Sequence, residues 1–468
     1  MIFLKHPINF LLIIALLGVV VFRNITTIET VQPDSNRYIA MGLNLAEYNT
    51  LSGDPYSPAH SPNPGIGWGG TAIAYEIALA ATLHEPTKRN LICIANAAKH
   101  GQNAFRTACH VYIPSLKIIH IIEFFIFHLA VLCVAQLIFD NRFKAWSSVG
   151  ISLCFQETSL YVDQLLTEPS YMMFAGIFLT AWAFAWKNPQ SHKSWFFCGF
   201  ALGCVVLTKP AWNALLPSLF ILLAAYVLWN RHLLAWATRS VFALALGLIV
   251  VVAPIVLRNI VQLNVWSLSD PAYLAASLAH RMAFNAMTWK EWAMGWLYYM
   301  PRSGAIRLFG IEALNPIGLG PDSYFSYGYN VLTGKAHALG GDDQGAIRYI
   351  LKNHFFNDPV KGIAVTALLT WKGVFVGHVL GMFAVMFTGL FPFFSRGDTR
   401  RSILILILPL IIMAAVNALA SISMSRYNMA LILPYSLILV HFFYLFCTCV
   451  MSKMPKVFIN KVKTFFDE

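Results

Sequence analysis

The sequence has 468 residues, of which 58% are hydrophobic and 12% are charged, and its mean hydropathy is +0.62. A typical soluble domain has about 25% charged residues, and a globule as apolar as this one would not stay dispersed in water. These values exclude a disordered chain, a coiled coil, a nucleic-acid-binding domain and a disulfide-rich secreted scaffold. They indicate a polytopic membrane protein, so the net charge of +12 bears first on topology.

Hydrophobic segments recur along the whole chain. A helix needs about 20 apolar residues to span the hydrocarbon core of a membrane. Ten predicted transmembrane helices lie near residues 8–25, 113–139, 146–163, 169–186, 195–208, 211–229, 240–257, 373–394, 402–421 and 429–450. The stretch 65–83 is also apolar, but it contains Glu76, and we expect it to lie in the interface or to re-enter the membrane. The predicted fold is therefore all-α and polytopic, with residues 1–468 forming a single transmembrane domain.

The distribution of Lys and Arg over the short loops predicts the orientation of the chain. Short loops of one parity contain Arg142, Lys144, Lys187, Lys193, Arg231, Arg239, Arg396, Arg400 and Arg401. Those of the other parity contain only Lys209 and Arg426. By the positive-inside rule both termini are cytoplasmic, including a basic tail at 451–468. The two long loops, 26–112 and 258–372, then face outward, and their length predicts short helices and a function of their own.

Cysteine and histidine spacing gives no metal-binding motif. Cys93 and Cys109 both fall in the first outward loop, where the sequence leaves a disulfide and two reduced thiols equally open. His120 and His128 are eight residues apart on one face of the second predicted span, with no third ligand evident in the sequence. We therefore interpret them as packed histidines.

Two acidic residues stand at the predicted outer surface. Asp34 follows the first span in the segment TVQPDSNRYIAMGLNLAEYNTLS, at the start of a predicted helix. Glu168 lies at the outer end of a hairpin and is followed by Pro169. Asp is a favoured helix N-cap, so capping is one interpretation of Asp34. Ionisable groups at membrane depth are costly and commonly functional, which favours a second interpretation as site residues.

Three cations share this outer surface, against the positive-inside rule. They are Lys209 in TKP, Arg258 in APIVLRN and Arg426 in SRYNMALILP. Arg binds phosphate bidentately and Lys binds it as a point charge. Together with the two acids, they predict a site for an anionic, lipid-linked ligand.

This combination suits transfer of a sugar from a lipid phosphate to a hydroxyl. A carboxylate is needed to take the proton of the acceptor hydroxyl. Fixed positive charge is needed where the departing phosphate gains negative charge. A pair of carboxylates alone would indicate hydrolysis by water, but the basic setting at the membrane surface favours transfer.

The order and placement of these motifs resemble the GT-C superfamily of membrane glycosyltransferases, which includes protein O-mannosyltransferases and the lipid A aminoarabinose transferase. The resemblance covers most of the chain. It is carried by DSNRYIAMGLNL at 34–45, SPNPG at 61–65, LTEP at 166–169, GFALG at 199–203 with TKP, PIVLRN at 254–259, and RY at 426–427.

The resemblance implies a role for each matching residue. Asp34 would be the catalytic general base, and Tyr38 would lie on the acceptor side. Glu168, Lys209, Arg258 and Arg426 would bind the donor and its phosphate. Ser35 stands where many relatives carry a second acid, so too few hard ligands remain to predict a divalent metal, and no cofactor is expected.

The resemblance also implies partners and a location. These are a polyprenyl-phosphate sugar donor, a glycan, glycolipid or protein acceptor, and the lipids of a bacterial inner membrane, with no nucleic acid. Two other classes stay open from the sequence. One is a lipid or sugar transporter or flippase, although internal repeats are not evident. The other is a non-catalytic scaffold subunit of the same fold.

Overall fold

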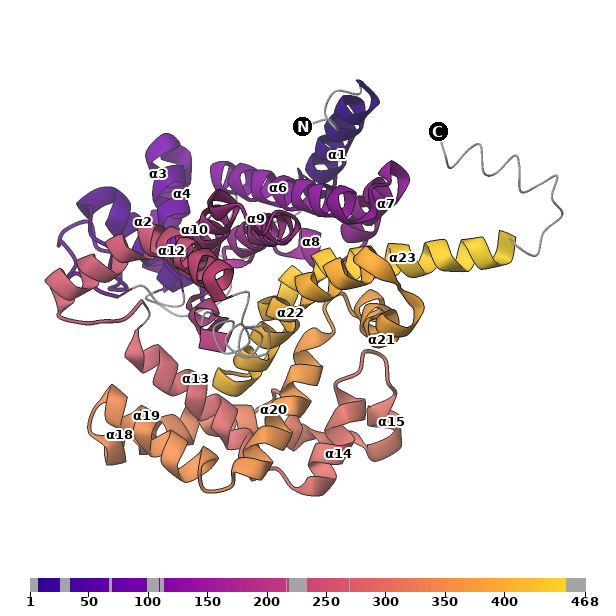
Figure 1. Ribbon diagram of the computed structural model, residues 1–468. Helices are drawn as coiled ribbons and strands as arrows, with labels where there is room; N and C mark the ends of the chain where they lie inside the picture. Colours follow the sequence, from indigo (N-terminus) through magenta and orange to yellow (C-terminus); the bar gives the residue numbers. More distant parts are fainter. Residues whose placement is uncertain are drawn as a thin grey trace.

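Helices make up all the regular structure of the described chain (Figure 1). The computed structural model describes residues 7–25, 34–66, 70–98, 109, 113–215, 217–218, 234–268 and 270–451. Long helices pack side by side in one part of the molecule, and shorter helices from the two long loops cluster at its edges (Figure 1). The predicted all-α class is confirmed.

Four helices of the described chain are long and apolar enough to cross a membrane. These stretches are Pro114–Phe139, Ala235–Leu263, Gly397–Ala420 and Ser425–Val450. They correspond to α6 (Pro114–Phe139), α12 (Leu234–Leu263), α22 (Gly397–Ala420), and the 3-10 helix η8 (Ser425–Leu431) continued by α23 (Ile432–Met451). The protein is therefore an integral membrane protein, while the total of ten spans stays a prediction.

The other predicted spans correspond to shorter helices. They are α1 (Pro7–Ile25), α7 (Arg142–Leu153), α9 (Glu168–Lys187), α10 (His192–Thr208) and α21 (Val379–Phe394). Most of the predicted span 211–229 lies outside the described residues, apart from the short η2 (Pro210–Ala214).

The predicted span 146–163 is wrong as one continuous helix. The helix α7 ends at Leu153, and after a turn only the four-residue α8 (Glu157–Leu160) follows. The reason is the buried Glu157, whose carboxylate accepts a hydrogen bond from the backbone N–H of Gly377 at 2.8 Å. A carboxylate held by backbone in this way favours a local turn over a lipid-facing helix.

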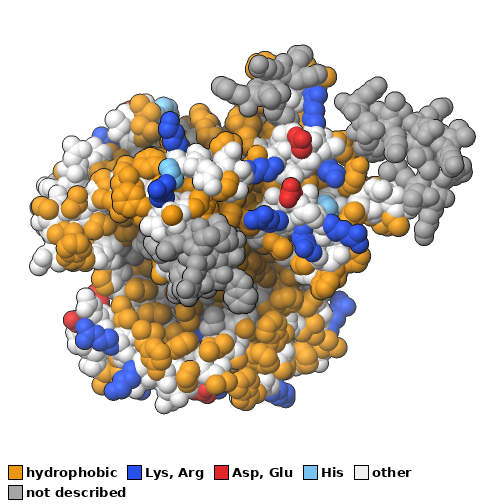
Figure 2. All heavy atoms as spheres, in the orientation of Figure 1, with side chains coloured by type: hydrophobic (Ala, Val, Ile, Leu, Met, Phe, Trp, Pro, Cys, Tyr) orange, Lys and Arg blue, Asp and Glu red, His pale blue; other side chains and the backbone are white. Residues whose placement is uncertain are grey.

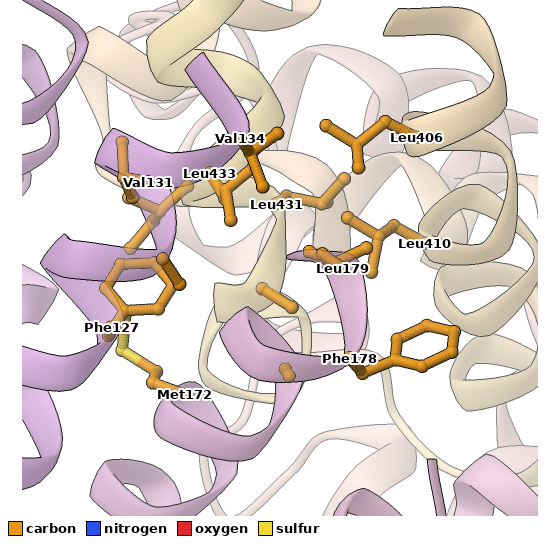
Figure 3. Close-up of a cluster of buried hydrophobic side chains, with 14 of the residues drawn as sticks. Phe127, Val131, Val134, Met172, Phe178, Leu179, Leu406, Leu410, Leu431 and Leu433 are labelled. Carbon is orange, nitrogen blue, oxygen red and sulfur yellow. The ribbon is translucent and has the colours of Figure 1, made fainter. Parts of the chain in front are cut away.

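The core of the transmembrane part joins helices from both ends of the chain (Figure 3). Phe127, Val131 and Val134 of α6 meet Met172, Phe178 and Leu179 of α9, Leu406 and Leu410 of α22, Leu431 of η8 and Leu433 of α23. Lipid tails are as apolar as these side chains, so close packing and dispersion, more than water exclusion, hold the helices together. This packing brings the start of α9 next to η8.

The helices α10 and α12 approach each other at glycines. A Cβ atom on Gly199 would lie 1.8 Å from the carbonyl oxygen of Leu244, and one on Gly247 would lie 2.0 Å from that of Phe196. Any larger residue would separate the two backbones. The small-xxx-small spacing of GFALG at 199–203 thus packs helices as expected, and it fixes the C-terminal part of α10, after which Lys209 follows.

The described residues of the first long loop form the helices α2 (Ser35–Tyr48), α3 (Ala72–Leu83) and α4 (Glu85–Ala98). Cys93 and Cys109 form a disulfide, which settles the choice that the sequence left open. In the described part of the apolar stretch 65–83 the helix α3 begins at Ala72, and the preceding Thr71 donates its backbone N–H to the carbonyl oxygen of Leu207 of α10 at 2.8 Å. This hydrogen bond attaches the loop to the transmembrane helices.

The second long loop forms a separate cluster of short helices below the long ones in Figure 1. It runs from α13 (Pro271–Ala283) through α14 (Trp289–Tyr298), α18 (Thr333–Gly340) and α19 (Asp343–Ile350) to α20 (Pro359–Val374). The fully buried Arg281 of α13 donates to the carbonyl oxygens of Ala418 at 2.6 Å and Gly362 at 2.9 Å. These bonds hold α13 against α22 and α20.

Lys and Arg side chains gather on the surface around α7 in the face that Figure 2 shows, while hydrophobic side chains cover much of the rest. Arg142 and Lys144 at the start of α7 belong to the short loops predicted to be cytoplasmic. Orientation relative to the membrane stays a prediction.

Candidate functional site

A cavity of about 310 Å³ lies where the first loop, the second loop and the transmembrane helices meet. Its charged lining residues are Asp34, Glu168, Lys209 and Arg426, and Tyr38 lies beside them. Five of the six residues that the sequence predicted for the site therefore surround one cavity. They come from segments spread over almost the whole chain: α2 and its N-cap, α9, the end of α10 and η8.

Two larger grooves lie elsewhere on the helices and differ in character. One, of about 1010 Å³, is lined by Lys193, Arg239 and mainly apolar residues, and the other, of about 600 Å³, is almost wholly apolar. Neither contains a carboxylate. The cavity of about 310 Å³, by contrast, combines acids, cations and hydroxyl groups.

Asp34 stands at the N-cap position of α2 but does not cap the helix. Its side chain accepts no hydrogen bond from the first turn of α2. Instead Oδ2 lies 3.5 Å from a terminal nitrogen of Arg426, and the side chain is 35% exposed. The capping interpretation therefore does not describe the geometry, and the carboxylate is accessible from the cavity.

One N–H group of the Arg426 guanidinium has no hydrogen-bond acceptor. Its terminal nitrogen donates to the hydroxyl of Tyr427 at 3.2 Å as well as facing Asp34. Its Nε is buried and has no hydrogen-bond partner. A buried N–H of a cation without an acceptor is costly, so this atom indicates where an anionic ligand would bind.

Glu168 and Lys209 form the second charge pair. The Lys209 ammonium donates to Glu168 Oε1 at 3.0 Å, and their side chains are 16% and 2% exposed, respectively. Glu168 is the first residue of α9, where the positive end of the helix dipole stabilises a carboxylate. The ammonium also lies 5.2 Å from the centre of the Tyr427 ring, which adds a cation–π contact.

The four charges balance, since Asp34 and Glu168 contribute two negative and Lys209 and Arg426 two positive charges. A phosphate that binds the two cations would compete with the carboxylates for them. The remaining wall is largely apolar, including Leu166, Trp212, Leu274, Val416 and Ala420.

Hydroxyl groups complete the lining. Burial raises the pKa of Tyr38 well above its usual value and raises that of Tyr273 as well. Both phenols therefore keep their protons at neutral pH. Ser277, one turn after Tyr273 on α13, also lines the cavity.

Sequence reasoning missed the contribution of α13. Asp270 caps this helix through the N–H of Ala272 at 3.0 Å, and Pro271 begins it. That Asp-Pro start predicts a helix in the second loop. It does not indicate that Tyr273 and Ser277 face the cavity, because the placement of α13 depends on the long-range contacts of Arg281.

Arg258 is not among the residues that line the cavity. Its guanidinium donates to the carbonyl oxygens of Leu51 and Gly65, both at 2.6 Å, and to Asn259 Oδ1 at 2.8 Å. The structure therefore does not bring it together with the other predicted site residues. Its position supports a different role, in which it fixes the SPNPG turn of the first loop to the C-terminal end of α12.

Comparisons with known proteins give one distant structural similarity. No protein-family model matches the sequence, and no curated protein matches it either. Among solved structures, the chain is similar to ArnT from Cupriavidus metallidurans bound to undecaprenyl phosphate, with 14% identity over 93% of this chain and 77% of that one. The TM-score is 0.35, too low to support any inference about substrate or mechanism.

Proposed function

We propose that the protein is a membrane glycosyltransferase that moves a sugar from a polyprenyl-phosphate donor to an acceptor hydroxyl on the extracytoplasmic face. The observation that carries this proposal is the cavity itself. The carboxylate of Asp34, which does not cap α2, lies 3.5 Å from Arg426, a partly buried cation whose Nε has no hydrogen-bond acceptor. A base and an anion-binding group are the two parts that this reaction needs.

In the proposed reaction, the acceptor oxygen bonds to the anomeric carbon while the bond from that carbon to the phosphate oxygen breaks. Asp34 takes the proton of the acceptor hydroxyl. Lys209 and Arg426 stabilise the negative charge that develops on the leaving polyprenyl phosphate. No metal ion is required for this step, because the two side-chain cations supply the charge. Glu168 holds Lys209 in place through the 3.0 Å contact.

The apolar wall of the cavity supports a lipid-linked donor over a soluble nucleotide sugar. Val416 and Ala420 of α22 and Leu274 of α13 adjoin the charged groups. A polyprenyl chain would run along such residues toward the bilayer, with its phosphate at Arg426. The hydroxyls of Tyr38, Tyr273 and Ser277 are suited to hydrogen-bond a sugar or an acceptor.

The test is transfer by the purified full-length protein in nanodiscs. The protein is incubated with a panel of radiolabelled polyprenyl-phosphate sugars and an extract of cell-envelope glycolipids, glycans and membrane proteins. The proposal expects label to move to an acceptor, with free polyprenyl phosphate as the second product. Movement of intact donor between the leaflets of liposomes without transfer would instead support a flippase. Donor binding without either activity would support a scaffold subunit.

A further inference from the structure

A second polar cluster lies at the junction of the first loop with the transmembrane helices. Glu76 of α3 meets His120 and Glu123 of α6, and one potential ligand atom from each residue lies within 4.8 Å of the others. The side chains of His120 and Glu123 are almost wholly buried, with residue exposures of 2% and 4%. None of the three residues lines the cavity of the proposed active site.

All three residues direct an unsatisfied atom into this cluster. Glu76 Oε2, His120 Nε2 and Glu123 Oε2 are buried and have no hydrogen-bond partner. Buried polar atoms are nearly always paired, and two carboxylates side by side repel each other. Among the described residues, no ion pair reaches either glutamate, whereas the nearby Asp163 is paired with Lys117 at 3.2 Å. A bound cation would satisfy all three atoms at once.

The orientation of His120 is that of a metal ligand. Its Nδ1 lies 3.0 Å from the carbonyl oxygen of Val162. A carbonyl can only accept, so Nδ1 carries the proton and Nε2 presents its lone pair to the glutamates. Metal-binding histidines are commonly fixed through their second nitrogen in this way.

From this geometry we propose that Glu76, His120 and Glu123 bind one divalent transition-metal ion, with Zn²⁺ as the best fit. Two carboxylates neutralise the double charge of the ion. The imidazole selects Zn²⁺ or a similar metal over Mg²⁺ and Ca²⁺, which prefer oxygen ligands alone. Three protein ligands leave a fourth position of a tetrahedral site for water.

The site would join the first loop to the transmembrane helices. Glu76 lies on α3, which packs against α2, and α2 begins directly after Asp34. The two other ligands lie on α6, which packs against α9. The metal would therefore hold the loop that carries Asp34 in place over the start of α9. It would act by position, without contact with the substrate.

Sequence spacing did not reveal this site. His120 and His128 share a helix face, but His128 Nδ1 lies 2.8 Å from the hydroxyl of Ser152 and takes no part in the cluster. The third ligand comes from Glu76, 44 positions before His120, in a loop helix whose placement the sequence does not specify. His128 is for the same reason a matched control for His120.

The experiment measures metal binding by the full-length protein in detergent. The protein is stripped with EDTA, exposed to Zn²⁺ alone, dialysed, and analysed by inductively coupled plasma mass spectrometry and by thermal unfolding. We expect about one Zn²⁺ per chain and a higher Tm with Zn²⁺. Uptake should be lost in His120→Gln and in Glu76→Gln/Glu123→Gln, and retained in His128→Gln. Wild-type uptake far below one ion per chain, or full uptake by His120→Gln, would overturn the proposal.

X-ray absorption at the zinc edge of the wild-type protein keeps the test decisive if a variant fails to fold. The proposed ligands predict only nitrogen and oxygen neighbours at about 2.0–2.2 Å. Sulfur neighbours at about 2.3 Å would show that Zn²⁺ binds free cysteines such as Cys447 and Cys449, and would contradict the site. If Mn²⁺ alone were taken up stoichiometrically, the ligand set would stand and the choice of Zn²⁺ would be wrong. Because no sugar transfer is measured, the result is independent of the proposed function.

Discussion

The carboxylate of Asp34 lies 3.5 Å from the guanidinium of Arg426, although the two residues are 392 positions apart in the chain. One follows the first helix and the other precedes the last. Both side chains line the cavity where the two long loops meet the transmembrane helices. Their contact pairs the proposed base with the side chain proposed to bind the donor phosphate.

Removal of the Arg426 charge should weaken donor binding. A hydrogen bond to a charged group contributes about 1.5–3 kcal/mol, so Arg426→Ala should raise the Kd for a polyprenyl-phosphate donor about 10- to 100-fold. Arg426→Lys should recover only part of this loss, because an ammonium cannot bind phosphate bidentately. Donor binding to the protein in nanodiscs measures both. Equal affinity of wild type and Arg426→Ala would place the phosphate elsewhere.

Lys209 and Glu168 should behave as a coupled pair. The Glu168 side chain is only 2% exposed, and Lys209→Met removes the cation that pairs with its carboxylate. Loss of one partner of a buried pair typically costs about 3–5 kcal/mol, and much of that should return in the double variant Lys209→Met/Glu168→Gln. Thermal unfolding measures this recovery of stability.

Sugar transfer separates the two roles of this pair. If Lys209 stabilises the leaving phosphate, the double variant should stay inactive although its stability has recovered. Recovery of both properties would show that the pair only holds α9 against the end of α10.

Arg258 should affect the first loop and not the donor phosphate. Arg258→Ala removes the hydrogen bonds to the carbonyl oxygens of Leu51 and Gly65. We expect faster proteolysis of the first loop and a lower kcat, with the donor Kd within a few-fold of wild type. Limited proteolysis and donor binding, with Arg426→Ala as the comparison, provide the measurement. A rise in Kd as large as that of Arg426→Ala would return Arg258 to the phosphate site.

The predicted orientation can be tested by labelling single cysteines. Pro55→Cys in the first loop and Asp398→Cys at the start of α22 are both at exposed positions. In a background where the free cysteines are replaced by serine, an impermeant thiol reagent should label position 55 from outside and position 398 only after permeabilisation. Labelling of position 398 in intact cells would reverse the topology.

The sequence singled out the four charged residues that line the cavity because they are anomalous in a membrane protein. Lys209 and Arg426 stand out as cations in short loops on the side that is poor in positive charge. Asp34 and Glu168 stand out as acids next to hydrophobic spans. These anomalies are local, so they are readable without knowledge of the tertiary structure. The all-α class follows from composition in the same way.

Residues placed by long-range contacts were not predictable. Tyr273 and Ser277 reach the cavity because Arg281 fixes α13 to carbonyl groups of α20 and α22. Arg258 is a residue type that can bind phosphate, but its guanidinium donates its hydrogen bonds to backbone carbonyl oxygens of the first loop. Hydropathy likewise predicted a continuous span at 146–163. An average over a window of residues does not detect a single buried carboxylate such as Glu157, which binds a backbone N–H in a segment where the helix is interrupted.

The most direct test of the proposed function is the rate of sugar transfer by Asp34→Asn. This substitution keeps the size of the side chain and removes the base. General-base catalysis contributes about 10²- to 10⁴-fold, so kcat should fall by roughly that factor. The Tm should barely change, because Asp34 makes no capping hydrogen bond in the structure.

The measurement is turnover of a polyprenyl-phosphate sugar by purified wild-type and Asp34→Asn protein in nanodiscs, with donor Kd and Tm determined on the same samples. We predict a loss of kcat of at least about 10²-fold with an unchanged Tm. Turnover within a few-fold of wild type would contradict the assignment of Asp34 as the base.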